Sequence, residues 1–190
     1  GKELDSLTDV ISFGVAPSFV MYFWAVNALG KFGWMTVLIY SVCCALRLAR
    51  FNLMEIDENE SWKINFFEGV PSPAAAGLVL LPLLLNLSNL VQFENYAVLS
   101  SIAILTTSFL MVSKIPTYSL KRILIPRNFA IFLLLGIGIY VSLLIFYTFE
   151  TLFLTGIIYL LLIPASFIHY RQKNKKSIVI SKEEDDEDVL

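Results

Sequence analysis

The residues best suited to chemistry in this chain are two aspartates near its start, Asp5 and Asp9. Gly1, Asp5, Asp9, Ser12 and Ala16 recur every three or four residues, so a helix here would present one small, polar stripe. Two carboxylates on one helix face can bind a divalent cation, and their oxygen atoms favour Mg²⁺, Mn²⁺ or Ca²⁺ over zinc. Because acidic residues also stabilise a helix start, the pair alone leaves the function open.

A second group of polar residues could bind a charged substrate. Arg47 and Arg50 lie three residues apart and share a helix face, and their planar donors suit phosphate or carboxylate groups. An alternative interpretation makes them membrane-boundary anchors whose charges extend to the surface. Asn52 and Ser72 are further candidates for a polar pocket.

The elements that would position these residues are membrane-spanning helices. The 190 residues are 57% hydrophobic and 16% charged, whereas soluble domains are about 25% charged. Crossing the bilayer takes about 20 apolar residues. We predict an all-α, polytopic transmembrane bundle with at least one more span before residue 1 and six visible spans, at residues 4–27, 33–53, 72–93, 95–113, 129–149 and 151–168. The last two should form an antiparallel hairpin separated near Glu150, and Pro17 should kink the first span.

Charge predicts the orientation of these spans. Of the fourteen Lys and Arg residues, every one except Lys31 falls on the same side if the six spans alternate. The positive-inside tendency makes that side cytoplasmic and places both aspartates near it. Residues 1–170 would form the transmembrane domain, and the charged segment 171–190, which ends in a run of acids, would be a disordered cytoplasmic tail.

Three segments of the sequence resemble a known family. Gly1-x-x-x-Asp5-x-x-x-Asp9 is similar to the second half of the signature of the CDP-alcohol phosphatidyltransferases, D-x2-D-G-x2-A-R-x8-G-x3-D-x3-D, whose first half would precede residue 1. Residues 4–17 (LDSLTDVISFGVAP), 47–52 (RLARFN) and 67–76 (FEGVPSPAAA) look like bacterial members of the family that use serine.

The resemblance implies an activity and a set of roles. The enzyme would transfer the phosphatidyl group from CDP-diacylglycerol to the L-serine hydroxyl, giving phosphatidylserine and CMP. Asp5 and Asp9 would help to hold Mg²⁺ or Mn²⁺ on the pyrophosphate, and Asp9 would be the catalytic base. Gly1 would allow close approach of the nucleotide, and Arg47, Arg50, Asn52 and Ser72 would bind substrate.

The resemblance also implies a setting for the enzyme. We expect an integral protein of the bacterial inner (cytoplasmic) membrane with its active site facing the cytoplasm, a homodimer in contact with lipid, and no nucleic-acid partner. Because half of the signature would be missing, the 190-residue chain alone is expected to be inactive. Two alternatives remain: the same family with glycerol 3-phosphate or inositol phosphate as acceptor, and a membrane transporter, since intramembrane carboxylates also mark ion pathways.

Overall fold

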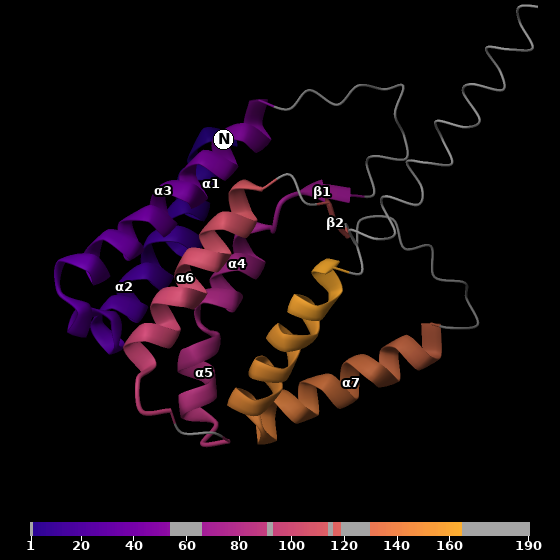
Figure 1. Ribbon diagram of the computed structural model, residues 1–190. Helices are drawn as coiled ribbons and strands as arrows, with labels where there is room; N and C mark the ends of the chain where they lie inside the picture. Colours follow the sequence, from indigo (N-terminus) through magenta and orange to yellow (C-terminus); the bar gives the residue numbers. More distant parts are fainter. Residues whose placement is uncertain (1, 54–65, 91–92, 114–115, 119–129, 165–190) are drawn as a thin grey trace, which may run out of the picture.

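Helices make up nearly all of the chain that the computed structural model describes, namely residues 2–53, 66–90, 93–113, 116–118 and 130–164. The predicted all-α class is therefore confirmed (Figure 1). The helices are α1 (Lys2–Asp9), a π-helical segment (Val10–Val15), α2 (Ala16–Trp24), a 3₁₀ turn (Val26–Leu29), α3 (Lys31–Leu53), α4 (Ser72–Val79), α5 (Leu81–Leu87), α6 (Tyr96–Val112), α7 (Ala130–Phe146) and a final described helix, Thr148–Pro164. Strand β1 (Phe66–Glu68) pairs antiparallel with β2 (Pro116–Tyr118), with Phe67 opposite Thr117.

Among the residues that the structure describes, two helices are long and apolar enough to cross a membrane, Leu4–Trp24 and Lys31–Asn52. They correspond to the first two predicted spans. The apolar helices Tyr96–Val112, Ile131–Phe146 and Thr148–Pro164 lie within or near three of the other predicted spans but are shorter. The predicted tail at 171–190 lies outside the described residues, as does Gly1, so the division into a domain and a tail stays a prediction.

The helix predicted over 72–93 is not continuous. The structure divides it into α4 and α5, with Leu80 between them. Pro82 lies in the first turn of α5, and a proline there cannot donate to the carbonyl of Leu78 four residues earlier. The predicted boundary at Glu150 also moves: the last two helices separate at Tyr147, and Glu150 lies in the first turn of Thr148–Pro164.

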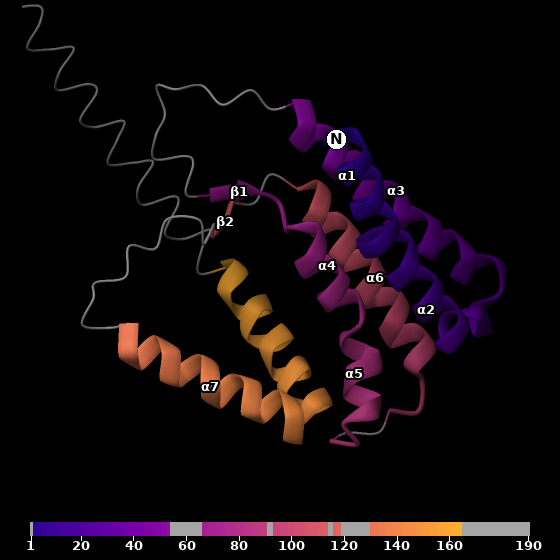
Figure 2. The same cartoon turned by 180° about the vertical axis from the view of Figure 1, so that it is seen from behind.

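The helix ends alternate between the two ends of the molecule. In Figure 1 the start of α1 and the ends of α3, α6 and Thr148–Pro164 lie toward the upper end, and the connections from α2 to α3 and from α7 to Thr148–Pro164 lie at the lower end. The view from behind shows the same arrangement (Figure 2). This is the alternation on which the orientation from charge depends.

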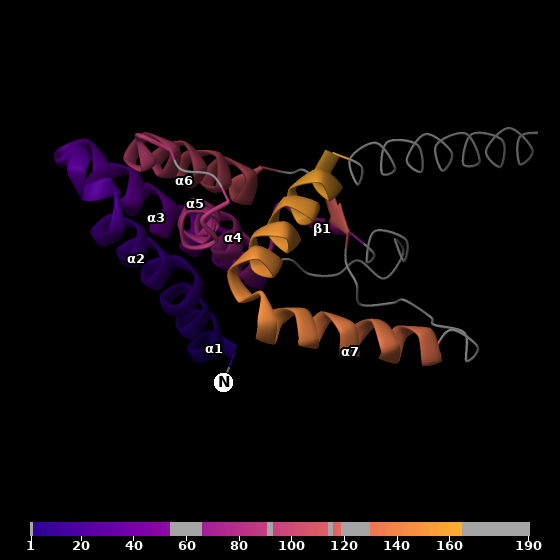
Figure 3. The same cartoon turned by 90° about the horizontal axis from the view of Figure 1, so that it is seen from below.

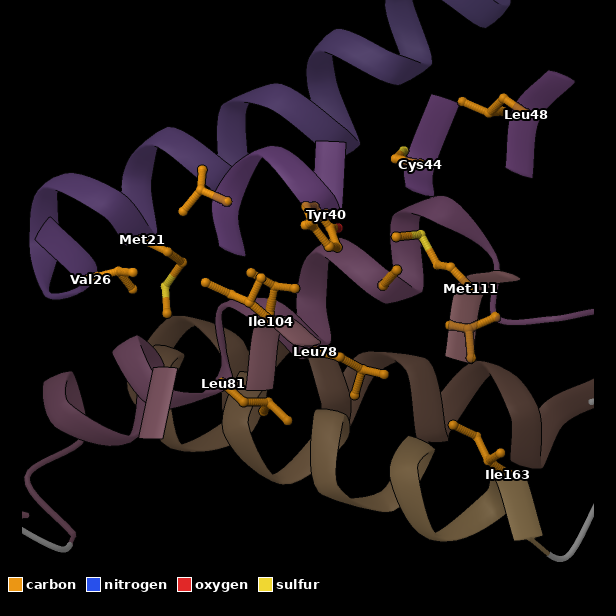
Figure 4. Close-up of a cluster of buried hydrophobic side chains, with 14 residues drawn as sticks. Met21, Val26, Tyr40, Cys44, Leu48, Leu78, Leu81, Ile104, Met111 and Ile163 are labelled. Atoms are coloured by element: carbon orange, nitrogen blue, oxygen red, sulfur yellow. The ribbon is translucent and has the colours of Figure 1, made fainter. Parts of the chain in front are cut away.

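The core forms where α3, α4 and α6 meet. Helix α3 packs most extensively against α6, and Tyr40, Ile104, Met111 and Leu78 are among the buried side chains of one cluster (Figure 4). In the view from below, α4 and α5 lie between α3 and the helix Thr148–Pro164, and α7 lies at the edge of the molecule (Figure 3). Every side chain at 131–146 except Leu144 is exposed. Such an apolar exterior is what a lipid environment requires.

The predicted kink at Pro17 takes the form of the π-helical segment that precedes it. Pro17 has no N–H to donate to the carbonyl of Phe13 four residues earlier. The Tyr40 hydroxyl of α3 donates to that carbonyl at 2.8 Å, and the Ser18 hydroxyl donates to the carbonyl of Gly14 at 2.7 Å. Side chains thus cover the broken backbone, as a span in lipid requires.

The close approach at the start of α3 gives a first testable prediction. A Cβ at Gly33 would overlap the backbone carbonyl of Val26, which no side-chain rotation can relieve, whereas a Cβ at Gly77 would meet nothing within 4 Å. We expect Gly33→Ala to destabilise the protein by about 1–3 kcal/mol and Gly77→Ala to be neutral or stabilising by up to about 1 kcal/mol. Thermal unfolding midpoints in detergent measure both, and equal midpoints for the two variants would contradict the close packing.

Candidate functional site

The two aspartates lie in one helix, as their spacing predicts. Asp5 and Asp9 both belong to α1, one turn apart, with Asp5 exposed and Asp9 half-buried. The described residues include no side chain that forms an ion pair with Asp5 or donates a hydrogen bond to either carboxylate. Their oxygen atoms are therefore available to a ligand.

The end of α3 is fastened to α1 between the two aspartates. Asn52 donates from its side-chain Nδ2 to the Ser6 hydroxyl at 2.8 Å, across 46 positions of the sequence. Ser6 follows Asp5 directly, so this bond fixes the carboxylate-bearing turn against α3. The structure gives Asn52 a positioning contact, and its predicted role in binding substrate stays a prediction.

Arg47 connects α3 to the start of α4. Its Nη1 donates to the Ser72 hydroxyl at 2.7 Å, and Ser72 is buried. The Nε of Arg47 is also buried but has no hydrogen-bond partner in the described protein. Asp9 lies close enough for its negative charge to act on the guanidinium. Arg47 therefore presents a cationic donor that is still unsatisfied at this end of the bundle.

Arg50 lies at the rim of this region. Its Nη1 donates to the backbone carbonyl of Val112, at the end of α6, at 3.1 Å in an exposed position. That contact fits the interpretation of Arg50 as an anchor at the membrane boundary, because it satisfies a carbonyl that the end of α6 leaves open. Its predicted contact with substrate is untested.

The structure thus brings together most of the residues singled out in the sequence. Asp9, Arg47 and Ser72 come from α1, α3 and α4 and lie at one end of the bundle, with Asn52 holding α3 to α1. Sequence reasoning missed two neighbours. Ser6 carried a signal, since it lies between the aspartates, whereas Tyr159, which is within electrostatic range of Arg47, carried none among the apolar residues of 156–164.

The carboxylates fit part of a divalent-cation site. Carboxylate oxygens on one face, one exposed and one half-buried, suit Mg²⁺ or Mn²⁺, which keep several waters and take few protein ligands. Within the described ranges no third Asp, Glu, His or Cys joins them in a metal-ligand group. Asp5 and Asp9 would therefore supply two of the ligands.

Comparison with known proteins identifies a family whose model matches the part of the chain that contains these residues. The model of the family described as CDP-alcohol phosphatidyltransferase matches residues 1–112, which contain Asp5, Asp9, Arg47, Arg50 and Ser72. A second model, described as CDP-alcohol phosphatidyltransferase 2, matches residues 128–164. The two matches together include both the aspartate helix and the final described hairpin.

Several curated relatives share one name, CDP-diacylglycerol–serine O-phosphatidyltransferase. The protein of Mycobacterium tuberculosis (strain ATCC 25618 / H37Rv) is 37% identical over 142 residues, which cover 73% of this chain and 49% of the relative. That of Helicobacter pylori (strain ATCC 700392 / 26695) is 40% identical over 123 residues, 65% of this chain and 50% of the relative. That of Bacillus subtilis (strain 168) is 38% identical over 122 residues, 64% and 60% respectively. The matched region spans about half the length of these relatives.

Proposed function

Because this chain belongs to the CDP-alcohol phosphatidyltransferase family, we propose that it is the carboxylate-bearing part of an enzyme that makes phosphatidylserine. The enzyme transfers the phosphatidyl group of CDP-diacylglycerol to the hydroxyl of L-serine and releases CMP. The curated relatives that carry the name of this reaction, at 37–40% identity, support serine as the acceptor.

One structural observation supports the proposal independently of sequence similarity. Three segments far apart in the sequence meet at one end of the bundle: α1 with its two aspartates, α3 with Arg47, and the start of α4 with Ser72. A cationic donor within electrostatic range of one of two carboxylates suits a reaction in which one substrate carries phosphates and the other must lose a proton.

Asp5 and Asp9 have overlapping roles in the proposed reaction, because both would bind the cation and Asp9 is also the base. A divalent cation, Mg²⁺ or Mn²⁺, would be held by both carboxylates and would neutralise charge on the pyrophosphate. Asp9 takes the proton from the serine hydroxyl, whose oxygen then forms a bond to the lipid-side phosphorus as the bond to CMP breaks. Asp9 is half-buried and within electrostatic range of Arg47, and positioning supplies much of the rate because an aspartate is a weak base.

The polar residues behind the aspartates hold the substrates. Arg47 binds a phosphate or carboxylate with its unsatisfied Nε, Ser72 fixes the orientation of the guanidinium, and Asn52 fixes α1. Arg50 adds positive charge at the rim. Gly1 lies outside the described residues, and its contact with the nucleotide rests on the family signature alone.

The chemistry of the substrates decides where the site must lie. The nucleotide is water-soluble and the diacylglycerol is not, so the site belongs at the membrane surface, open sideways to lipid. The distribution of Lys and Arg supports a cytoplasmic location for that surface, and the bacterial inner membrane is part of the proposal. A homodimer is part of the proposal, and cross-linking in membranes that gave only monomer would contradict it.

The deciding experiment measures CMP release from CDP-diacylglycerol by the full product of the gene that encodes this chain, with Mg²⁺ or Mn²⁺ present. We expect release that depends on L-serine and on the cation. Release that depends instead on glycerol 3-phosphate or inositol phosphate would keep the site and change the acceptor. No release with any of these alcohols would contradict the proposal.

A further inference from the structure

Buried polar atoms without partners are rare, because losing hydrogen bonds to water without replacing them is costly. The described residues contain three such side-chain atoms: the Nε of Arg47, the hydroxyl of Ser100 and the hydroxyl of Tyr159. Two of these atoms belong to Arg47 and Tyr159, which lie within range of electrostatic interaction with each other. They come from α3 and from the helix Thr148–Pro164, two elements more than a hundred positions apart in the sequence.

The helix Thr148–Pro164 turns the Tyr159 face toward the bundle. Gly156 lies against Leu81 of α5, since a Cβ there would come within 2.5 Å of a Leu81 methyl carbon. Ile163 is buried in the core cluster and is drawn below Leu78 and Met111 in Figure 4. Gly156, Tyr159 and Ile163 recur every three or four residues and so share this face. The Tyr159 hydroxyl is therefore directed inward, whereas the opposite face of its helix is exposed.

Arg47 determines what kind of group would satisfy both atoms. Its Nη1 is committed to Ser72, which fixes the plane of the guanidinium and leaves Nε–H as a directed cationic donor. A phenol can donate a second hydrogen bond to the same acceptor. A group that accepts from a guanidinium and a phenol together is an oxyanion, either a phosphate or a carboxylate oxygen.

We propose that the Tyr159 hydroxyl and the Arg47 Nε together bind one oxyanion of a substrate, so that the final described helix supplies part of the binding site. This proposal rests on the proposed function for the identity of the substrates, which offer two sources: the phosphate of CDP-diacylglycerol and the carboxylate of L-serine. Tyr159 is a binding residue in this role and takes no part in proton transfer.

The test uses Tyr159→Phe, which removes only the hydroxyl, in the full gene product. We expect the KM for one substrate to rise about tenfold, with kcat changed less. A rise confined to L-serine identifies the carboxylate, and a rise confined to CDP-diacylglycerol identifies the phosphate. Tyr140→Phe is the matched control: Tyr140 is exposed on α7, and its hydroxyl pairs only with Thr155 in the same hairpin, so both KM values should stay at the wild-type level.

A second measurement separates binding from a purely structural role. Removing an unsatisfied buried hydroxyl should leave the unfolding temperature of the ligand-free protein unchanged or raised, while the added stabilisation by L-serine or by inorganic phosphate should shrink. A lower ligand-free unfolding temperature with unchanged KM values would assign Tyr159 to packing alone and overturn the proposal. Unchanged KM values and unchanged ligand-induced shifts would mean that a water fills this position, which also overturns it.

The two proposals fail separately. If the wild-type protein releases CMP with serine and Tyr159→Phe behaves as wild type, the oxyanion site is wrong and the proposed function stands. If no alcohol supports CMP release but phosphate raises the unfolding temperature of the wild type and not of Tyr159→Phe, the oxyanion site stands and the proposed function is wrong.

Discussion

Replacing Asp9 with asparagine should reduce CMP release by about 10²–10⁴-fold, the usual contribution of a positioned general base. Asparagine keeps the shape of the side chain but cannot take a proton from the serine hydroxyl, and it is a weaker ligand for a divalent cation. The half-buried position of Asp9 in α1 should tolerate the amide, so the protein should fold normally. The measurement is serine-dependent CMP release at saturating CDP-diacylglycerol, with the thermal unfolding midpoint of each protein as the check on folding.

Glu94→Gln supplies the matched control for loss of one negative charge. Glu94 is exposed just before α6, at the end of the bundle away from Asp9, so its amide variant should keep wild-type activity. Activity of Asp9→Asn within a few-fold of wild type would remove Asp9 from the reaction. Restoration of that activity by higher Mg²⁺ or Mn²⁺ would instead assign Asp9 to cation binding rather than to proton transfer.

Replacing Arg47 with lysine should raise the KM for one substrate by about 10–100-fold, because hydrogen bonds to charged groups are worth about 1.5–3 kcal/mol. Lysine keeps the positive charge but has no Nε donor in a fixed plane and cannot hold Ser72 and a ligand at the same time. The loss should therefore appear in binding even though the charge remains. Steady-state kinetics with each substrate varied in turn measure it.

Two other variants test whether the effect belongs to the geometry at Arg47. Arg50→Lys should change KM less, since Arg50 is exposed and bonds to the carbonyl of Val112. Ser72→Ala leaves Arg47 present but removes the acceptor that orients it, so the KM of the same substrate should rise by a smaller factor. Equal effects of Arg47→Lys and Arg50→Lys would indicate a diffuse charge effect and contradict a directed Nε contact.

The local part of the site was predictable from the sequence, because helix geometry alone puts residues three or four apart on one face. This accounts for Asp5 with Asp9, which the structure places in one helix. Which helices meet is not contained in such spacing. The bonds from Asn52 to Ser6 and from Arg47 to Ser72 join residues 46 and 25 positions apart, and they depend on how α1, α3 and α4 pack.

The errors in the fold have a common cause. The absence of charge predicts one continuous helix over 72–93, but charge says nothing about backbone hydrogen bonds, and Pro82 in the first turn of α5 interrupts the helix near Leu80. The absence of charge also gives no reason to single out Tyr159, because its hydroxyl is uncharged and lies on a large ring among apolar residues. Only the packing of Gly156 and Ile163 distinguishes its inward face.

In the π-helical turn at Val10–Val15, the number of residues matters more for the site than the identity of their side chains. A π-helical turn holds one residue more than an α-helical turn, so it rotates everything before it by about 100° relative to a continuous α-helix. The core-facing side of α2 and the aspartate face of α1 are set relative to each other by this extra residue. Substitutions in the turn can therefore be absorbed by repacking, whereas loss of a single residue keeps the aspartate face in its present orientation only if the turn becomes α-helical at the same time. Sequences that keep this site should either preserve the spacing between Asp9 and Pro17 or combine a spacing one residue shorter with a continuous α-helix.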